Sequence, residues 1–377
     1  MSTPERIAFD ARYVNDRYHG IGRYAFRLLE ALVVEQERTF IVFRGQEQDS
    51  RFDWRSLVAQ PNVELREGPW PLYWPQEQYR WPWLLRQSRA DLFYSPYFVA
   101  PLLSPCPVVI TIHDLIFDRY PEYMPWAWSR PYYRLLMKLS TRRAQRIISV
   151  SQATAHDLLH YYKILPGKVS VTREGVEPSF GTVPHEDRLW ALRRQYKLER
   201  PVILSVGARR PHKNLARLVR AFASLVPHVA HDLLLVGPAD NRFPDEAREV
   251  AAEAGLNGRV RFLDWVPETD LASLYALADL VVVPSLVEGF GLPALEAMAS
   301  GTPVLATRTS SLPEVVGEAG VLVDPYDTEA LASGMRELLY DEARRQRLAE
   351  AGRMRAQSFT WRQVARQVLR VYEGAVE

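Results

Sequence analysis

The arrangement of this chain can be worked out from the segment Pro284-Ser-Leu-Val-Glu-Gly-Phe-Gly-Leu-Pro-Ala-Leu-Glu-Ala-Met-Ala-Ser-Gly301. It follows the apolar run 279–283, which is typical of a buried parallel strand. Gly289 and Gly291 allow a tight turn in which the backbone comes close to a ligand. Pro293 suits the first helical position, and the final glycine suits the left-handed residue that ends a helix. We therefore predict a strand, an open glycine loop and a helix N-terminus, a unit that binds anions through unpaired N–H groups and the helix dipole.

Two carboxylates frame this predicted anion site, Glu288 in the loop and Glu296 about one turn into the helix. A carboxylate repels a phosphate, so these glutamates are better suited to hydroxyl groups on either side of it, as when an acidic residue holds the ribose in dinucleotide folds. A ribose, a diphosphate and a sugar in a row describe a nucleotide sugar. The alternative is an ordinary strand–helix unit with two solvated glutamates, and the spacing alone does not separate the two interpretations, because glutamates are common at helix starts.

The composition is that of a soluble globular protein with room for two domains. The chain has 377 residues, of which 47% are hydrophobic and 24% charged. Its net charge of +2 gives no electrostatic reason to expect a nucleic acid partner. The single cysteine, Cys106, excludes an internal disulfide framework and suits a reducing compartment. We expect a cytoplasmic protein without a signal peptide, because residues 1–10 have no long apolar region and prolines interrupt 99–112, the nearest approach to a membrane span.

Short apolar runs alternate with helical segments in two series along the chain. The first series of predicted strands comprises residues 7–10, 39–43, 91–94, 108–112, 146–151 and 168–171. The second series comprises residues 201–207, 232–237, 259–263, 279–283, 302–306 and 320–323. This alternation predicts two doubly wound α/β domains in tandem, and the cleft between such domains is the expected ligand site.

A second glycine motif, His19-Gly-Ile-Gly-Arg-Tyr-Ala25, leads into a helix that we expect to run to about Gln36. Gly20, Gly22 and Ala25 match a dinucleotide fingerprint in their letters. That fingerprint places its turn directly after a strand, whereas about eight residues intervene here. We therefore predict that this glycine loop covers a bound sugar or phosphate rather than a nicotinamide. The alternative, a dehydrogenase, requires that the protein bind NAD.

Polar residues follow several of the predicted strands at the edge where ligands collect in parallel sheets. His113 and Asp114 end the fourth strand of the first series. Arg209, Arg210 and Lys213 follow the first strand of the second series, where cations can neutralise a diphosphate. The structural alternatives are a buried, hydrogen-bonded histidine and a solvated basic turn, and position alone favours neither interpretation.

With these residues assembled, the chain resembles the retaining glycosyltransferases of the GT-B fold, specifically family 4, over nearly its whole length. The strongest match is Glu288-Gly-Phe-Gly-Leu-Pro-Ala-Leu-Glu296, that family's pair of glutamates separated by seven residues. Further matches occur in the same order at residues 19–24, 111–114, 207–214, 310–320 and 323–327.

The resemblance implies an α/β fold of two Rossmann-like, doubly wound domains that face each other across a cleft. Residues 1–178 would form the N-terminal, acceptor-binding domain, on which the C-terminal helix, 360–377, would pack. Residues 185–358 would form the C-terminal, nucleotide-sugar-binding domain.

The resemblance also implies how the opening segment would hold a donor. Glu296 would accept hydrogen bonds from the ribose hydroxyls, and Glu288 from the hydroxyls of the donor sugar. The diphosphate would meet the backbone of the loop and the helix N-terminus, formed by Gly289, Phe290, Gly291 and Leu292.

Further residues are implicated outside that segment. Lys213, with Arg209 or Arg210, would neutralise the diphosphate and stabilise it as it leaves. The family usually has an arginine directly after the glycine at position 207, whereas this chain has Ala208, so the choice between the two arginines stays open. His113 would lie beside the reacting sugar. Gly20 and Gly22 would let the first domain approach the phosphate and the acceptor.

The reaction implied is transfer of a hexose with retention of the anomeric configuration, in which the leaving phosphate takes the proton of the acceptor. Cationic side chains would stand in for a metal ion, and the sequence lacks an Asp-x-Asp pair, so we expect a metal-independent enzyme without a cofactor. The loop and residues 311–316 most resemble those of bacterial mannosyltransferases, and this resemblance favours GDP-mannose as the donor, with UDP-glucose as the alternative. A nucleotide-sugar epimerase on the same fold is a second enzyme class, and a binding module without catalysis is a third interpretation.

The acceptor, a glycan or a lipid-linked molecule, would bind the first domain. Residues 70–83 are rich in aromatic side chains, which stack on sugars and also lie at membrane interfaces. Residues 130–143 are basic and amphipathic, which suits an anionic lipid surface. We hypothesise weak peripheral contact with the inner face of a membrane; the alternative for 130–143 is a helix with one core face and one solvated face.

Overall fold

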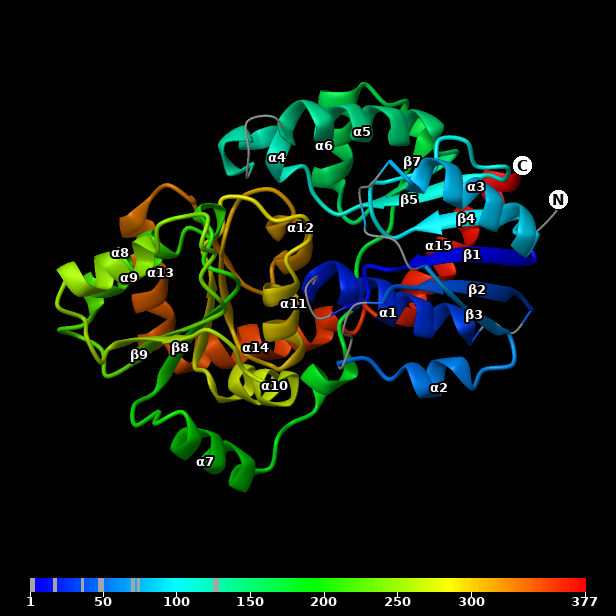
Figure 1. Cartoon of the computed structure of the whole chain (residues 1–377). Coiled ribbons are helices and arrows are strands. Elements are labelled where there is room, and N and C mark those ends of the chain that lie inside the picture. Colours follow the sequence, from blue (N-terminus) through cyan, green and yellow to red (C-terminus); the bar gives the residue numbers. More distant parts are fainter. Residues whose placement is uncertain are drawn as a thin grey trace. The chain divides into compact units, whose positions relative to one another are not determined.

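The computed structural model describes residues 4–15, 19–34, 37–46, 51–68, 72, 75–124 and 129–377, with only the backbone described for His19. The chain forms two compact units (Figure 1). Unit 1 comprises Met1–Gly175 and Trp361–Glu377, and unit 2 comprises Val176–Thr360. The chain therefore passes between the units twice, after Gly175 and after Thr360.

In the part of unit 1 that the structure describes, the strands form a seven-stranded parallel sheet in the order β3-β2-β1-β4-β5-β6-β7. The strands are β1 (Arg6–Ala11), β2 (Thr39–Arg44), β3 (Val63–Glu67), β4 (Leu92–Ser95), β5 (Val108–Ile112), β6 (Arg146–Ser149) and β7 (Val169–Val171). The sequence predictions missed β3. Its sequence, VELRE, is mostly polar because β3 is an edge strand that is only partly buried.

The helices of unit 1 are α1 (His19–Val33), α2 (Trp54–Val58), α3 (Glu77–Ser88), α4 (Ile116–Arg119), α5 (Ser129–Arg143), α6 (Gln152–Tyr162) and α15 (Trp361–Val376), with the short 3₁₀ turns η1 (Pro121–Tyr123) and η2 (Pro166–Lys168). The C-terminal helix α15, red in Figure 1, packs beside the blue α1. Its buried Tyr372 lies against Tyr94 of β4, with the ring centroids 5.3 Å apart. The last residues of the chain thus complete the core of the first unit.

The prediction of a glycine loop around Gly20 and Gly22 is wrong, because both residues lie in the first turn of α1. A Cβ atom at position 22 would lie 2.7 Å from the carbonyl oxygen of Tyr13. Glycine is therefore required at position 22 by the close approach of the helix to the backbone that follows β1, rather than by a turn.

Unit 2 is a six-stranded parallel sheet in the order β10-β9-β8-β11-β12-β13. The strands are β8 (Val202–Val206), β9 (Asp232–Val236), β10 (Val260–Leu263), β11 (Leu280–Val283), β12 (Val304–Thr307) and β13 (Val321–Val323). The helices are α7 (Glu186–Gln195), α8 (Leu215–Leu225), α9 (Glu246–Glu253), α10 (Glu268–Leu277), α11 (Leu292–Ala299), α12 (Leu312–Val316), α13 (Thr328–Tyr340) and α14 (Glu342–Ala356), with the 3₁₀ turns η3 (Pro178–Gly181) and η4 (Pro211–Lys213). The prediction of two Rossmann-like α/β domains is therefore confirmed.

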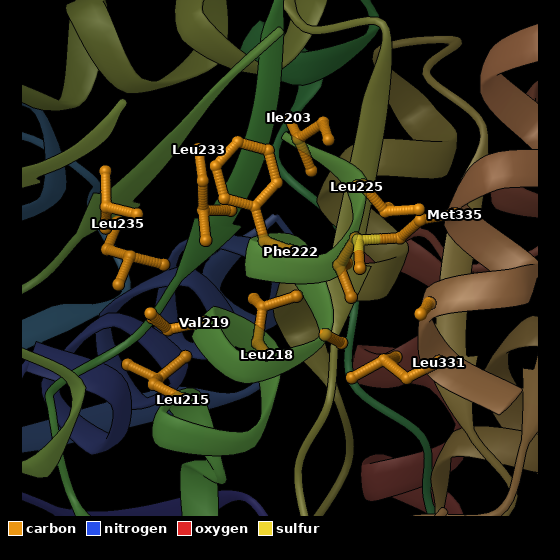
Figure 2. Close-up of a cluster of buried hydrophobic side chains, with 14 of the residues drawn as sticks. Ile203, Leu215, Leu218, Val219, Phe222, Leu225, Leu233, Leu235, Leu331 and Met335 are labelled. Atoms are coloured by element: carbon orange, nitrogen blue, oxygen red, sulfur yellow. The ribbon is translucent and has the colours of Figure 1, made fainter. Parts of the chain in front are cut away.

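Helix α8 forms the centre of the core on one face of the second sheet (Figure 2). Its apolar residues recur at the helical spacing of three and four, so they line one face: Leu215, Leu218, Val219, Phe222 and Leu225. They pack against Ile203 of β8, Leu233 of β9 and Met335 of α13. Because each fully buried side chain of this size contributes about 2 kcal/mol, this core holds the start of α8 firmly against the sheet.

The strand order of each unit reverses direction next to its first strand. In unit 2, β8 lies between β9 and β11, so the loops that follow β8 and β11 diverge at the carboxyl edge of the sheet. In unit 1, β1 lies between β2 and β4 in the same way. Ligands of doubly wound folds bind in the crevice at such a switch point, which directs attention to residues 207–214 and 284–291 in unit 2.

Candidate active site

The predicted strand, glycine loop and helix N-terminus are all present in unit 2. Strand β11 ends at Val283, and α11 begins at Leu292, with Gly291 as its N-cap residue in the left-handed region at φ +106°. Pro293 is the second helical residue, one position later than expected, because Gly291 already provides the turn. Gly301 is left-handed at φ +71°, as predicted for the end of the helix. The N–H group of Leu292, the first residue of α11, has no acceptor within the helix and lies beside the glycine loop.

Hydroxyl groups from the segment after β12 hold this loop in shape. The Ser310 hydroxyl lies 2.8 Å from the Glu288 amide nitrogen, from which it accepts a hydrogen bond. The Ser311 hydroxyl lies 3.0 Å from the carbonyl oxygen of Glu288 and 2.7 Å from that of Phe290. Thr309 donates to the Leu286 carbonyl oxygen at 3.2 Å. In the sequence, Ser310 and Ser311 entered only through the family resemblance. Adjacent hydroxyl side chains after a strand are nevertheless a signal for hydrogen bonds to a neighbouring loop.

Lys213 and Glu288 meet at the centre of the site. The Lys213 Nζ lies 2.7 Å from Glu288 Oε1, and the Ser285 hydroxyl donates to the same oxygen at 2.6 Å. Burial alone would raise the pKa of Glu288, but the Lys213 charge and these hydrogen bonds outweigh it, so the pKa of Glu288 lies below its usual value. The pair therefore joins a cation from the loop after β8 to a carboxylate from the loop after β11.

Asn214 holds the lysine turn in place. Its backbone is left-handed at φ 56°, and its side-chain amide donates to the carbonyl oxygens of Pro284 and Pro325 at 3.0 and 2.9 Å. Asparagine tolerates this conformation better than most residues. Next to the lysine, burial and the neighbouring Lys213 charge lower the pKa of His212 to about 3, so His212 is neutral at neutral pH.

Glu296 has a different environment from Glu288. It lies on α11, is only 3% exposed, and accepts a hydrogen bond of 2.9 Å from the Tyr275 hydroxyl of α10. The ring of Tyr275 packs in turn against Phe180 of η3, with the centroids 5.6 Å apart. The two glutamates thus have separate partners rather than forming a carboxylate pair.

The two candidate arginines also differ. Arg209 is buried and donates to Asp245 at 2.9 Å, to Asp264 at 2.6 Å and to the Gly237 carbonyl oxygen at 2.6 Å. Its guanidinium therefore joins the loops that follow β8, β9 and β10. Arg210 is half-exposed and is paired with Asp240 at 2.9 Å. Of the three predicted cations, the structure brings Lys213 directly to the glycine loop.

In unit 1, His113 follows β5 as predicted, and both of its ring nitrogens have partners. Nε2 lies 2.9 Å from the Pro96 carbonyl oxygen, and Nδ1 lies 3.2 Å from Oε1 of Glu174. The ring of Tyr24 meets the imidazole edge-to-face at 4.7 Å. This is the geometry of the structural alternative, a hydrogen-bonded histidine. No local pattern in the sequence points to Glu174.

The aromatic and basic stretches of unit 1 lie on α3 and α5. Residues 70, 71, 73 and 74 of the aromatic stretch lie outside the described residues. On α3, Tyr79 and Trp83 are 63% and 62% exposed and lie one helical turn apart, whereas Trp81 is buried. On α5, the exposed residues are Arg130, Pro131, Tyr132, Arg134, Leu135, Lys138 and Arg142.

Comparison with known proteins agrees with this geometry. Residues 190–355 match the family model described as glycosyl transferases group 1, and residues 18–180 match that of glycosyltransferase family 4. The D-inositol 3-phosphate glycosyltransferase of Salinispora arenicola is 38% identical over a region that covers 76% of this chain and 69% of that protein. The chain belongs to this glycosyltransferase family.

Two further likenesses of this glycosyltransferase extend over its whole length. The O-antigen chain mannosyltransferase B of Escherichia coli is 28% identical over 98% of this chain and 99% of that protein. The solved structure of sucrose-phosphate synthase from Thermosynechococcus elongatus has a TM-score of 0.76 at 25% identity, covering 98% of each chain. Glycosyltransferases of this type have the GT-B fold and use a nucleotide sugar as a substrate.

Two features of the glycosyltransferase concern metals and membranes. Among the described residues, no group of three or more His, Cys, Asp or Glu side chains is arranged to hold a metal ion. The helices in that same part of the chain are each too short or too polar to cross a membrane.

We predict that Lys213→Met destabilises the protein by about 3 kcal/mol at pH 7, because Glu288 is left buried without its cation. The loss should shrink as the pH falls towards 4. In the wild type, the low pKa of Glu288 gives stability that is present above the unfolded pKa and lost on acidification, whereas in the variant burial raises the pKa and protonation removes the cost.

Urea unfolding at the two pH values measures this difference. Lys138→Met, which removes an exposed lysine of α5, is the control and should change stability little at either pH. An equal loss at pH 7 and pH 4 in Lys213→Met would contradict the ion-pair interpretation.

Proposed function

We propose that this glycosyltransferase moves a hexose, with mannose as the first candidate, from a nucleoside diphosphate sugar to a glycan or lipid-linked acceptor, with retention of the anomeric configuration. The observation that carries the proposal is the Lys213–Glu288 pair, which lies beside the glycine loop and the N-terminus of α11. Unit 2 would bind the donor, and unit 1 would bind the acceptor.

The donor diphosphate binds at the N-terminus of α11 in this proposal. The backbone N–H groups of Gly289, Phe290, Gly291 and Leu292 and the positive end of the helix dipole attract its oxygens. Lys213 adds a full positive charge next to them. Arg209 already faces two carboxylates, so we assign the phosphate to Lys213, with the half-exposed Arg210 as the second cation.

The two glutamates hold the two ends of the donor. Glu296 accepts hydrogen bonds from the ribose hydroxyls while Tyr275 continues to donate to its other side. Glu288 accepts from a hydroxyl of the donor sugar and, through its contact with Lys213, links sugar binding to the diphosphate. A ribose and a hexose each present several hydroxyl donors, which suits carboxylates that have already been desolvated by the protein.

The chemistry follows from stabilising the leaving group. Lys213 and the helix N-terminus stabilise the charge that develops on the departing diphosphate, and an oxocarbenium-like centre then forms on the sugar. The acceptor hydroxyl attacks from the face that the phosphate leaves, and the phosphate oxygen takes its proton, so a side-chain base is not needed. In unit 1, His113 would lie beside the reacting sugar, and the first turn of α1, with Gly20 and Gly22, would supply N–H groups towards phosphate and acceptor.

The choice of donor draws on the relatives. The full-length likeness to the Escherichia coli mannosyltransferase favours mannose, and we infer GDP-mannose as the nucleotide sugar. The inositol phosphate glycosyltransferase is more similar in sequence but over a shorter region, so these two relatives do not decide the donor, and UDP-glucose stays the alternative.

We also propose that unit 1 contacts an anionic membrane through one surface, the α3–α5 face. It comprises Tyr79 and Trp83 of α3, the exposed Leu103, and Tyr132, Arg134, Leu135 and Lys138 of α5. Gln78 of α3 accepts a hydrogen bond from the Leu102 amide, and Arg143 of α5 donates to the Leu102 carbonyl oxygen, so the three elements adjoin. Exposed aromatic rings among basic side chains suit the headgroup region of a lipid surface.

The donor prediction is tested by incubating the purified protein with a panel of nucleotide sugars, without acceptor, and following the slow release of nucleoside diphosphate. We expect GDP-mannose to react fastest and the released sugar to keep its anomeric configuration. If the protein prefers UDP-glucose, UDP-glucose replaces GDP-mannose as the proposed donor. If an isomerised nucleotide sugar is released, the result favours an epimerase. If the protein neither turns over nor binds any nucleotide sugar of the panel, that result contradicts the proposed function.

The two glutamates should differ in their effects. Glu296→Ala should abolish the stabilisation by GDP, which at a hundredfold excess over Kd is about 2.7 kcal/mol in the wild type. Glu288→Ala should keep that stabilisation and lose sugar transfer. The measurement is a thermal shift with and without GDP, together with turnover. Glu296→Gln, which can still accept from Tyr275, controls for unfolding, and the exposed Glu253→Ala should resemble the wild type. Equal losses of GDP binding in Glu288→Ala and Glu296→Ala would refute these separate roles.

The membrane prediction concerns charge reversal on the α3–α5 face. We expect the wild type to co-sediment with phosphatidylglycerol vesicles at low salt and to detach at high salt. Arg134→Glu with Lys138→Glu should weaken binding by at least about thirtyfold, because the loss of each basic residue costs about 1 kcal/mol and the new carboxylates are also repelled. The double variant Arg336→Glu and Arg347→Glu, on exposed positions of unit 2, makes the same charge change and should bind normally. A wild type that stays in the supernatant at low salt removes the proposal.

A further inference from the structure

Glu174 is a buried carboxylate at the point where the chain leaves unit 1. It lies one residue before Gly175, the last residue of this part of the unit, and is 5% exposed. Its backbone is held on both sides. The Thr172 amide donates to the Ser149 carbonyl oxygen at 2.8 Å, which extends the pairing of β7 with β6. A Cβ atom at Gly175 would lie 2.7 Å from the Trp361 amide nitrogen, so the chain fits closely against the start of α15.

The partner of this carboxylate is the imidazole of His113, and the geometry decides where the protons lie. Nε2 faces the Pro96 carbonyl oxygen at 2.9 Å, and a carbonyl only accepts, so Nε2 carries a proton. Nδ1 faces Glu174 Oε1 at 3.2 Å. Two lone pairs would repel each other at this distance, so a proton lies between Nδ1 and the carboxyl group, and the ring is fixed in one orientation.

Neutral side chains also pack against His113. The Tyr24 ring of α1 lies edge-to-face on the imidazole, and burial raises the pKa of Tyr24 to about 12. The Tyr24 hydroxyl is 3.3 Å from that of Tyr94, which is 2.7 Å from the Thr111 hydroxyl. The Thr154 hydroxyl of α6 donates to the His113 carbonyl oxygen at 3.2 Å. Among these neighbours, Glu174 is the one with a carboxyl group.

We propose that Glu174 is a positioning residue for sugar transfer. It keeps a proton at Nδ1 and fixes the orientation of His113 at the carboxyl end of β5. The segment that carries the chain out of unit 1 thereby sets the state of the one histidine proposed to act on the donor sugar. This inference rests on the proposed function for the role of His113, but the pairing itself stands on the geometry of unit 1.

The kinetic test compares Glu174→Ala and Glu174→Gln with the wild type. In Glu174→Ala, the turnover number should fall roughly ten- to a hundredfold, the effect of losing one hydrogen bond to a charged group, while KM for the nucleotide sugar and the thermal shift with GDP stay unchanged. Glu174→Gln should recover part of the rate, because its amide can keep a hydrogen bond to Nδ1 and with it the orientation of the ring. Asp157→Asn, which breaks a similarly buried pair with Arg119 in the same unit, should leave turnover near normal. A turnover number in Glu174→Ala equal to that of Asp157→Asn overturns the proposal.

A spectroscopic test does not depend on activity. Nitrogen-15 NMR of the histidine-labelled full chain, with His113→Asn to assign the signal, reports the protons on both ring nitrogens. We expect the Nδ1 signal of His113 to move between wild type and Glu174→Ala, and an unchanged signal overturns the proposal. If the wild type neither binds nor hydrolyses any nucleotide sugar, the proposed function fails, while this measurement still tests the pair.

Discussion

The ion pair between Lys213 and Glu288 is the interaction on which the second unit's site depends. It connects the loops that follow β8 and β11, the two strands at which the sheet reverses its order. A carboxylate buried at this position would be costly without a cation, and a lysine here would repel the helix N-terminus without a carboxylate. The left-handed Asn214 and the hydroxyls of Ser310 and Ser311 hold the two loops at the distance that the pair requires. The same pair also provides both a cation and an acceptor where a diphosphate sugar would bind.

The number of carboxylates around each cation distinguishes Arg209, which holds loops together, from Lys213, which is proposed to bind the ligand. Arg209 and Lys213 lie four residues apart after the same strand, and both carry one positive charge. Arg209 faces Asp245 and Asp264, so two negative charges surround its one positive charge. Its hydrogen bonds also join three loops. Lys213 faces one carboxylate, which a ligand hydroxyl can share. A phosphate therefore gains more from approaching the lysine than from displacing the carboxylates of the arginine.

Local patterns in the sequence predicted most of the fold and part of the site. The apolar runs at β8, β9 and β11 and the left-handed Gly301 depend on neighbouring residues, so they could be predicted. The polar edge strand β3 and the helical state of Gly22 depend on distant packing, so they were missed. The ion pairs of Arg209 reach residues 36 and 55 positions away, and Glu174 lies 61 positions from His113. Such pairings depend on how the strands are ordered, which no local spacing encodes.

One short segment supports a proposed site residue in each unit. At its beginning, Glu174 pairs with His113 within unit 1. Six residues later, within unit 2, Phe180 packs on Tyr275, whose hydroxyl donates to Glu296. Glu174, Phe180 and Tyr275 are all buried, so a change in the backbone of this segment should disturb the partners at its two ends. The segment 174–180 therefore does more than connect the units. Glu174 is hydrogen-bonded to His113, and Phe180 packs on the tyrosine that donates to Glu296, the proposed nucleotide-binding glutamate. A substitution in this segment that alters packing without touching substrate should consequently affect turnover through either residue.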